Sequence, residues 1–319
     1  PEADKRKDAS WIPIIQADNF SGNFSKSSFS DMNGEMGFSY GEPLEKMYSV
    51  YKIASSDLIY VLSDNSADAL VSLQEGLDFT SGELVVNYRS QGNPTQPETE
   101  KEWGEIELKN FSMKYSDRLQ AMINLKGNIS YGDGKIRLEN LNGRYGDSPF
   151  QLEGEINRKK IKALEYALRL NFPSFLQSNL KDIPLFEDLK FSGPAHVSLN
   201  LNGNLDAFKF EHQADLTQVG YQIPGVLEKR TNALNKFKAK GSVLKNGGAT
   251  IDNWFYELSG NNVSGTAQIP DLDNPEFTIN LVADNFQVYP SRQFFRFFDA
   301  EMDGRADFEI VGYGNLNDL

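Results

Sequence analysis

Two histidines and an excess of carboxylates are the residues best able to do chemistry in this chain of 319 residues. His196 and His212 both fall within strand-like patterns, and they lack the close spacing of a metal-binding pair. Cysteine is absent, which excludes disulfides, thiolate metal sites and cysteine nucleophiles. We therefore expect both histidines to be ordinary strand residues and predict no metal site around them.

A short acidic segment matches the beginning of a calcium-binding EF-hand loop. Asp299, Glu301 and Asp303 stand at the first, third and fifth positions of the loop, and Gly304 stands at the sixth. The twelfth position is Ile310 instead of glutamate, and a strand pattern begins where a helix should follow. We therefore interpret the segment as a turn.

Catalytic residues are not predicted from this sequence. Paired carboxylates can hydrolyse glycosidic bonds, but here most of them occupy the polar positions of alternating segments, as Glu153, Glu155 and Glu309 do. The nucleophile elbow, the phosphate-binding P-loop and the dinucleotide-binding glycine pattern are all missing. We therefore expect a solvated acidic face, no cofactor and no enzymatic activity.

The charge balance excludes nucleic acid as a partner. Lysine and arginine number 32 against 45 acidic residues, so the net charge is 32 − 45 = −13, whereas phosphate contacts need clustered positive charge. No apolar run approaches the ~20 residues of a membrane span. The chain begins at Pro1 and ends at Leu319 within a pattern that has already occurred once. We therefore expect it to be a soluble piece of a longer protein whose membrane segment lies elsewhere.

Alternation of apolar and polar residues is the dominant pattern. It recurs in seven segments, which are 123–131, 150–156, 164–170, 195–201, 237–243, 277–281 and 306–310. Alternation gives each strand one apolar and one polar face, which is typical of antiparallel sheets. The pattern predicts an all-β protein. A few short helices are expected at 173–180 and 224–234, which both begin with proline, and at 291–300, which is rich in phenylalanine. The segment 91–101 is expected to be a loop or linker.

An internal repeat of about 111 residues organises the chain. An offset of 111 aligns Gly154 with Gly265 and Gly203 with Gly314, and upstream of residue 147 the offset becomes 114. A weaker echo of the repeat occurs at 69–73. We predict a degenerate N-terminal β repeat at 1–100 and two β repeats at 101–217 and 218–319.

Each repeat has an apolar sheet face that must be covered. The sheet could close as a barrel, pair as a sandwich, or curl into an open groove that holds something apolar. Small residues at Gly127, Gly154, Gly241, Gly265 and Ala267 favour curvature or close approach of a ligand, although a sandwich core requires the same alternation. The candidate groove-lining residues are Ile123, Leu125, Ile129, Ile136, Leu138, Leu152, Leu168, Val197, Leu199, Ile279, Leu281, Phe308 and Ile310.

Segments 193–208 and 304–316 share a pattern of glycine, alternating strand, glycine, asparagine and leucine, and 134–154 has the pattern of a hairpin. This repeat element and this hairpin resemble those of the AsmA-like family of bacterial envelope proteins. The resemblance covers about 105–319. It implies an elongated, curled β-groove in the periplasm of a Gram-negative bacterium, anchored to the inner membrane by a segment absent here. It also implies that the groove carries lipid between the two membranes without catalytic residues.

A phenylalanine-rich segment stands apart from the strands. The segment contains two arginines and four phenylalanines, which are Phe294, Phe295, Phe297 and Phe298. The segment could lie on a bilayer surface, or it could form a helix that caps the open end of the groove. We favour the cap, because the corresponding stretch one repeat earlier, 183–186, is also apolar.

The sequence alone leaves three candidate functions. The first is a groove that binds and transfers phospholipid or another acyl lipid. The second is a non-catalytic β-repeat scaffold that supports assembly of outer-membrane proteins through its strand edges. The third is a carbohydrate-active β-protein in which Trp11, Trp103 and Trp254 stack on sugars, and it is the least favoured because these residues share no motif.

Overall fold

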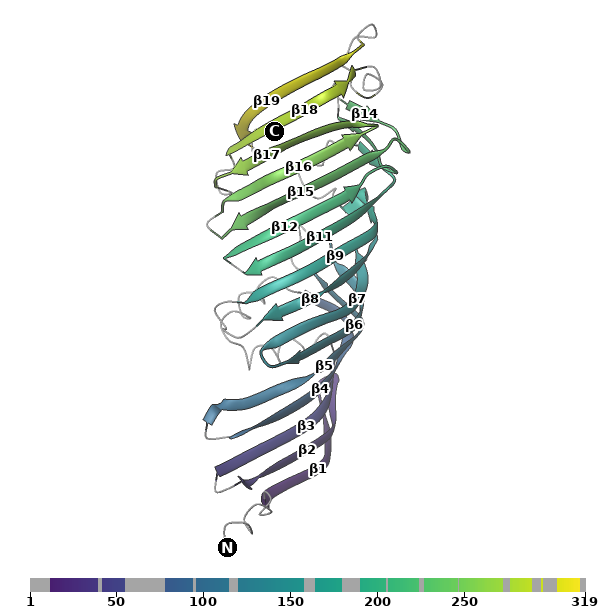
Figure 1. The fold of residues 1–319 in the computed structure, drawn as a ribbon. Helices are drawn as coiled ribbons and strands as arrows, with labels where there is room; N and C mark the ends of the chain where they lie inside the picture. Colours follow the sequence, from purple (N-terminus) through teal and green to yellow (C-terminus); the bar gives the residue numbers. More distant parts are fainter. Residues whose placement is uncertain are drawn as a thin grey trace. The chain divides into compact units, whose positions relative to one another are not determined.

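The computed structural model is nearly all β-structure (Figure 1). It describes residues 12–39, 42–54, 78–93, 96–114, 120–157, 164–179, 190–204, 206–223, 227–245, 247–271, 276–288, 294 and 303–315. Sixteen strands form one antiparallel sheet that is not closed into a barrel, and three short strands form a second sheet. The predicted all-β antiparallel fold is therefore confirmed.

The strands of the large sheet follow one another in chain order, with only the short strands omitted. Its first nine strands are β1 (Ile12–Phe24), β2 (Ser27–Ser39), β3 (Glu42–Ala54), β4 (Asp78–Asn93), β5 (Gln96–Lys114), β6 (Met122–Gly132), β7 (Lys135–Tyr145), β8 (Ser148–Asn157) and β9 (Glu165–Leu176). Its other seven strands are β11 (Pro194–Asn204), β12 (Ala207–Asp215), β15 (Asn235–Leu244), β16 (Ala249–Leu258), β17 (Asn261–Ile269), β18 (Glu276–Gln287) and β19 (Arg305–Asn315). The small sheet consists of β10 (Lys190–Ser192), β13 (Gly220–Ile223) and β14 (Leu227–Lys229).

The chain divides into two compact units. Unit 1 comprises 1–117, 121–143 and 155–162, and unit 2 comprises 118–120, 144–154 and 163–319. The sequence-predicted boundary between residues 100 and 101 lies inside β5, and the boundary after residue 217 follows β12.

The register of unit 2 reproduces the sequence repeat. Leu170 of β9 lies opposite Leu199 of β11, and 111 residues later Leu281 of β18 lies opposite Ile310 of β19. The two hairpins therefore pair the same positions. Since register is set by which face is buried, the repeat in the sequence is also a repeat of the strand pairing.

A β-bulge recurs at the same place in both hairpins. In β9 the register shifts between Phe172 and Phe175, and in β18 it shifts between Ala283 and Phe286, which are the positions 111 residues later. Asn285 within the second bulge has φ 57°, a left-handed conformation that asparagine tolerates. Such bulges add one residue and bend the strand.

A recurring hydrogen bond links the start of one strand to the end of the following strand. It identifies a third copy of the strand arrangement found in the two repeats. In each case the first residue of a strand accepts a backbone N–H bond from the last residue of the following strand. The donor and acceptor residues are Ala54 and Ser27, Leu176 and Ser148, and Gln287 and Asn261. The series β1–β3 therefore corresponds to β7–β9 and to β16–β18. The echo predicted at 69–73 lies outside the described residues.

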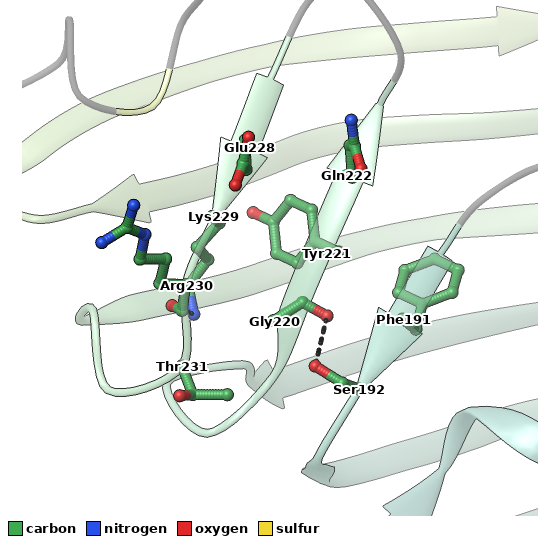
Figure 2. A pocket seen from close by; sticks show the side chains of 9 residues that line it. All are labelled: Phe191, Ser192, Gly220, Tyr221, Gln222, Glu228, Lys229, Arg230 and Thr231. Carbon is green, nitrogen blue, oxygen red and sulfur yellow. Dashed lines mark hydrogen bonds between the residues drawn. The ribbon is translucent and has the colours of Figure 1, made fainter.

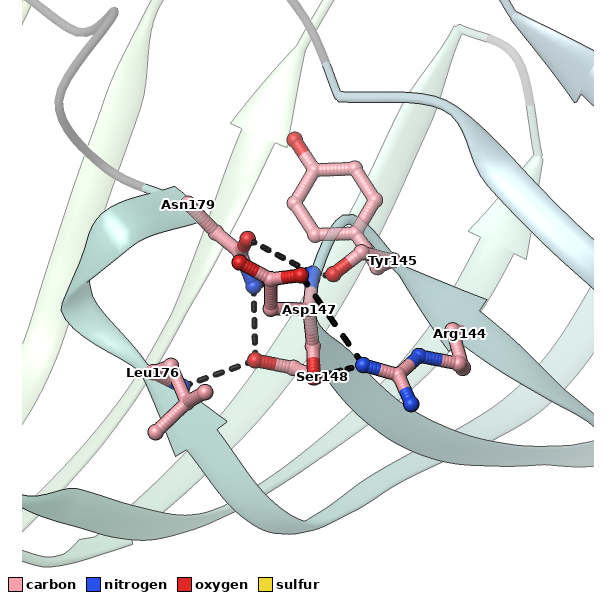
Figure 3. Close-up of polar contacts among 6 residues, drawn as sticks. All are labelled: Arg144, Tyr145, Asp147, Ser148, Leu176 and Asn179. Atoms are coloured by element: carbon pink, nitrogen blue, oxygen red, sulfur yellow. Dashed lines mark hydrogen bonds and ion pairs between the residues drawn. The ribbon is translucent and has the colours of Figure 1, made fainter.

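The Ser148 contact belongs to a larger buried network (Figure 3). The Nδ2 atom of Asn179 donates to Ser148 Oγ at 2.6 Å and to the carbonyl of Tyr145 at 2.8 Å, and its Oδ1 accepts from the N–H of Asp147 at 3.2 Å. Ser148 is fully buried and Asn179 is nearly so. The network holds the β7–β8 turn against the end of β9.

Two predicted helices and the predicted linker are wrong. Pro173 lies within β9, at the bulge where the ladder is already interrupted and a missing N–H costs little. A single 3₁₀ turn, Gln177–Asn179, follows β9. Residues 224–234 contain strand β14, and 91–93 and 96–101 belong to the paired strands β4 and β5. Apart from residue 294, the third predicted helix at 291–300 lies outside the described residues.

No helix within the described ranges is both long enough and apolar enough to cross a membrane.

Candidate functional site: the apolar face of the sheet

One face of unit 2 carries a row of mainly apolar residues that runs across eight strands. Residues directly opposite one another on paired strands share a face, so a row can be followed from strand to strand through the pairing register. The central row, from β9 to β19, is Leu170, Leu199, His212, Ala239, Trp254, Gly265, Leu281 and Ile310. A neighbouring row is Leu168, Leu201, Phe210, Gly241, Ile251, Ala267, Ile279 and Gly312.

Glycines in these rows allow a neighbouring strand to come close. A β-carbon on Gly241 would lie 1.9 Å from the carbonyl oxygen of Thr250, and one on Gly265 would lie 1.8 Å from that of Asn280. In the other copy, a β-carbon on Gly154 would lie 2.2 Å from the carbonyl oxygen of Ala167. Close approach of the neighbouring strand's backbone therefore explains why these three positions are glycine, whereas the sequence suggested curvature or close approach of a ligand.

Burial changes along the strands. At the end that carries the bulges the apolar face is covered, and its buried residues include Phe172, Ala195, Leu258, Ala283 and Phe286. The two rows above are mostly only partly buried, although both belong to the same apolar face.

The small sheet contributes to the covered end. Leu227 of β14, Leu258 of β16 and Phe294 form a buried cluster, and the N–H of Glu228 donates to the carbonyl of Phe294 at 2.8 Å. Phe294 is 6% exposed, so its ring packs inside the protein. This position suits the capping role that the sequence favours, while the other three phenylalanines, Phe295, Phe297 and Phe298, lie outside the described residues.

The structure places the eight lining candidates of unit 2 on this one face. Five belong to the two rows, and these are Leu168, Leu199, Ile279, Leu281 and Ile310. Val197 pairs with Phe172, and Phe308 pairs with Ala283. Leu152 stands two residues after Phe150, whose ring packs on Phe172 with centroids 5.8 Å apart. Ile310 is 53% exposed at the last strand.

The five candidates of unit 1 lie on its strands β6 and β7. Ile129 pairs with Ile106, and Leu125, only 5% exposed, pairs with Phe111. A bulge at Asn124, with φ 55°, brings Met122 opposite Met113, so simple alternation does not place Ile123 on the same face. Ile136 and Leu138 of β7 are partly buried.

Several residues of the apolar face are missing from the sequence-based set. They include Leu170, Leu201, Phe210, Ile251 and Trp254. Leu170 and Leu201 each lie two residues from a predicted lining residue, so the alternation along the strand already places them on the same face. Alternation alone does not place Trp254, because a register shift between Lys240 and Gly241 changes which residues of β16 lie on the apolar face.

The opposite face is polar, as the alternation predicts. Arg169 pairs with Glu153 at 3.2 Å, and Lys135 pairs with Glu155 at 2.8 Å. Hydrogen bonds from Lys135 and Arg137 lower the pKa of Glu155. These ion pairs are solvent-exposed and contribute little to stability.

The two histidines differ in environment. His196 is exposed, whereas His212 lies in the apolar row with its ring 5.8 Å from that of Phe237. Burial lowers the pKa of His212, which favours the neutral ring. Within the described part of the chain, no three residues capable of binding a metal are grouped together.

A pocket of about 420 Å³ opens on the small sheet (Figure 2). Its lining includes Phe191, Tyr221 and Lys229. Lys229 is 2% exposed, and its Nζ donates to the carbonyls of Val219 at 2.5 Å and Leu216 at 3.0 Å, with longer bonds to two further carbonyls. Desolvation lowers the pKa of this amine. The lysine therefore acts as a cross-link for the surrounding backbone.

Comparisons with protein-family models, with curated proteins and with solved structures find no match to this chain.

Proposed function

We propose that the apolar face of this sheet binds the acyl chains of phospholipid or a similar lipid, as part of a lipid-transfer groove of the AsmA-like type. The protein would act in the periplasm of a Gram-negative bacterium, between an inner-membrane anchor and an outer-membrane partner. No chemical step is involved. The acyl chains lie against the apolar rows while the headgroups stay in water.

The observation that carries this proposal is the partial exposure of a continuous apolar surface. In unit 2 the central row runs through eight paired strands, and its larger members, such as Leu199, Trp254 and Leu281, are only partly buried. Extended exposed apolar surfaces are uncommon on soluble proteins and generally mark a binding site.

The energetics favour an acyl chain as the occupant. Each methylene removed from water contributes about 0.8 kcal/mol. An alkyl chain has no polar group that must find a partner on a surface of leucine, isoleucine and phenylalanine. A continuous surface also suits a ligand that slides, because neighbouring rows offer similar contacts.

Tryptophan quenching by lipids with brominated acyl chains tests the proposal. Trp254 lies in the central apolar row, while Trp103, 38% exposed, lies opposite Arg89 on the polar face. We compare Trp11→Phe/Trp103→Phe, which keeps Trp254, with Trp11→Phe/Trp254→Phe, which keeps Trp103. Brominated phospholipid should quench the fluorescence of the first variant and leave that of the second nearly unchanged.

Equal quenching of both variants would indicate nonspecific association with the lipid, and absence of quenching in both would contradict the proposal. Native mass spectrometry of the purified protein supplies an independent measurement, because a groove occupied in the cell should retain phospholipid. A protein that neither retains nor takes up lipid would leave the β-repeat scaffold as the better function.

A further inference from the structure

The outer edge of strand β19 is the last edge of the large sheet on the C-terminal side. β19 pairs with β18 along one edge, from Glu276 opposite Asn315 to Gln287 opposite Arg305. No strand among the described residues pairs with its other edge. Every second backbone N–H and C=O of an edge strand lacks a ladder partner, which makes such an edge a template for another strand.

The repeat shows how this edge is used elsewhere in the same chain. β11 is the counterpart of β19 at the offset of 111, and its corresponding edge binds β12. In that pairing Phe208 lies opposite Gly203, and Phe210 lies opposite Leu201. The counterparts of Gly203 and Leu201 in β19 are Gly314 and Gly312.

Side chains of β19 are unusually apolar for an exposed strand. Val311 is 60% exposed and Tyr313 is 86% exposed, and both alternate with the residues of the apolar face. Their counterparts in β11 are Asn200 and Asn202, which are polar. At these positions β11 faces Glu211 and Lys209 of β12. A strand that pairs with the outer edge of β19 should therefore carry less charge opposite Val311 and Tyr313 than β12 would.

We propose that the outer edge of β19 docks the first strand of a further repeat of the same kind, antiparallel and in the register that β12 adopts on β11. This strand would place aromatic residues opposite Gly312 and Gly314, and apolar residues opposite Val311 and Tyr313. Its backbone N–H and C=O groups would extend the hydrogen-bond ladder of the sheet, and its side chains would continue the apolar rows. The inference does not depend on lipid binding.

A peptide that copies β12 provides the probe. Residues 204–216 of this chain, carrying a fluorophore, are titrated with the lipid-free protein, and a scrambled peptide serves as the control. A second peptide carries Lys209→Tyr and Glu211→Val, which replace the two charges that would face Tyr313 and Val311. Favourable cross-strand pairs should make it bind about two- to fivefold more tightly than the first peptide.

Substitutions in the protein locate the site. Val311→Lys and Tyr313→Lys change exposed side chains and should weaken peptide binding about tenfold or more, since lysine is a residue that natural edges use against strand addition. Phe20→Lys on β1, at the other edge of the large sheet and 58% exposed, is the matched control and should leave binding unchanged.

Hydrogen exchange of the unmodified protein gives a readout that does not depend on any variant. Peptide binding should slow amide exchange within 305–315 and leave β1 unaffected. Failure of both peptides to bind better than the scrambled one overturns the proposal, and so does binding that the β19 substitutions do not weaken. Self-association that these substitutions abolish, without peptide binding, would assign the edge to a second copy of this chain and overturn the proposed occupant.

Discussion

The Oγ atom of Ser148 accepts a hydrogen bond of 2.7 Å from the backbone N–H of Leu176. It joins the start of one strand to the end of the next, and Asn261 makes the corresponding bond to Gln287 at 2.6 Å. The side chain differs between the two copies while the bond is kept. The repeat therefore preserves a hydrogen-bond acceptor at this position rather than a particular residue.

Replacing Ser148 by alanine should destabilise unit 2. The variant leaves the N–H of Leu176 and an N–H of Asn179 without their acceptor in a buried place, which costs about 1–3 kcal/mol. Urea unfolding measures the loss. Ser130→Ala, which removes a long bond to Glu139 on the exposed surface, is the matched control and should change stability by less than about 0.5 kcal/mol. Equal losses in both variants would contradict the role of Ser148.

Replacing Gly265 by alanine should disrupt the β17–β18 pairing. The new β-carbon would lie 1.8 Å from the carbonyl oxygen of Asn280 and 3.0 Å from the ring of Trp254, so the backbone must shift. Overpacking of this kind costs about 1–3 kcal/mol. Gly34→Ala is the control, because the nearest atom to its β-carbon is 3.7 Å away. Thermal unfolding followed by circular dichroism compares the two variants, and a stable Gly265→Ala protein would contradict the close approach.

Replacing Lys229 by methionine should loosen the small sheet. Methionine keeps a similar length but cannot donate to the carbonyls that now accept from Nζ. Losing these bonds in a buried site should cost about 1–3 kcal/mol, and hydrogen exchange within 216–234 should accelerate. Lys236→Met, at an exposed position of β15, is the control. Unchanged exchange in the Lys229 variant would show that the carbonyls find other partners.

Alkaline pH should destabilise unit 1 through Tyr131. Burial, followed by the charge of Glu102, raises the pKa of this phenol to about 12. The unfolded chain releases the proton near pH 10 while the folded protein keeps it. The stabilising contribution of the neutral phenol is therefore complete below pH 10 and is lost between about pH 10 and 12.

Two measurements check this window. Absorbance at the phenolate band should show one or more tyrosines that titrate late in the folded protein, and one of these should disappear in Tyr131→Phe. The same variant should lose stability less steeply than the parent protein between pH 10 and 12. An identical pH profile for both proteins would exclude Tyr131 as a cause.

A charge on the apolar face should reduce lipid binding without unfolding the protein. Leu281 lies in the central row between Gly265 and Ile310 and is partly buried. Leu281→Lys puts an ammonium group where an acyl chain is proposed to lie, and we expect bound lipid to fall about tenfold or more because the charge must stay hydrated. Thr278→Lys on the polar face is the control. Equal lipid retention by the two variants would contradict the proposed surface.

Local patterns in the sequence were sufficient to predict most of the strands and the repeat. Side chains alternate across a strand, so the pattern around Leu168, Leu199 and Leu281 is visible without any knowledge of neighbours. Another local signal, proline at the start of a helix, gave wrong predictions at Pro173 and at 224–234. Pairing with adjacent strands overrides such local preferences, and no single segment contains that information.

Which residues share a surface depends on how the strands pair in the folded protein. Bulges at Asn124 and Asn285 shift the alternation within a strand, so the position of Ile123 could not be read from spacing alone. Trp254 joined the apolar face through a register shift that involves two strands. The outer edge of β19 is likewise a property of the whole sheet. These features depend on contacts between distant segments, and the sequence pattern of one strand fixes its faces but not its partners.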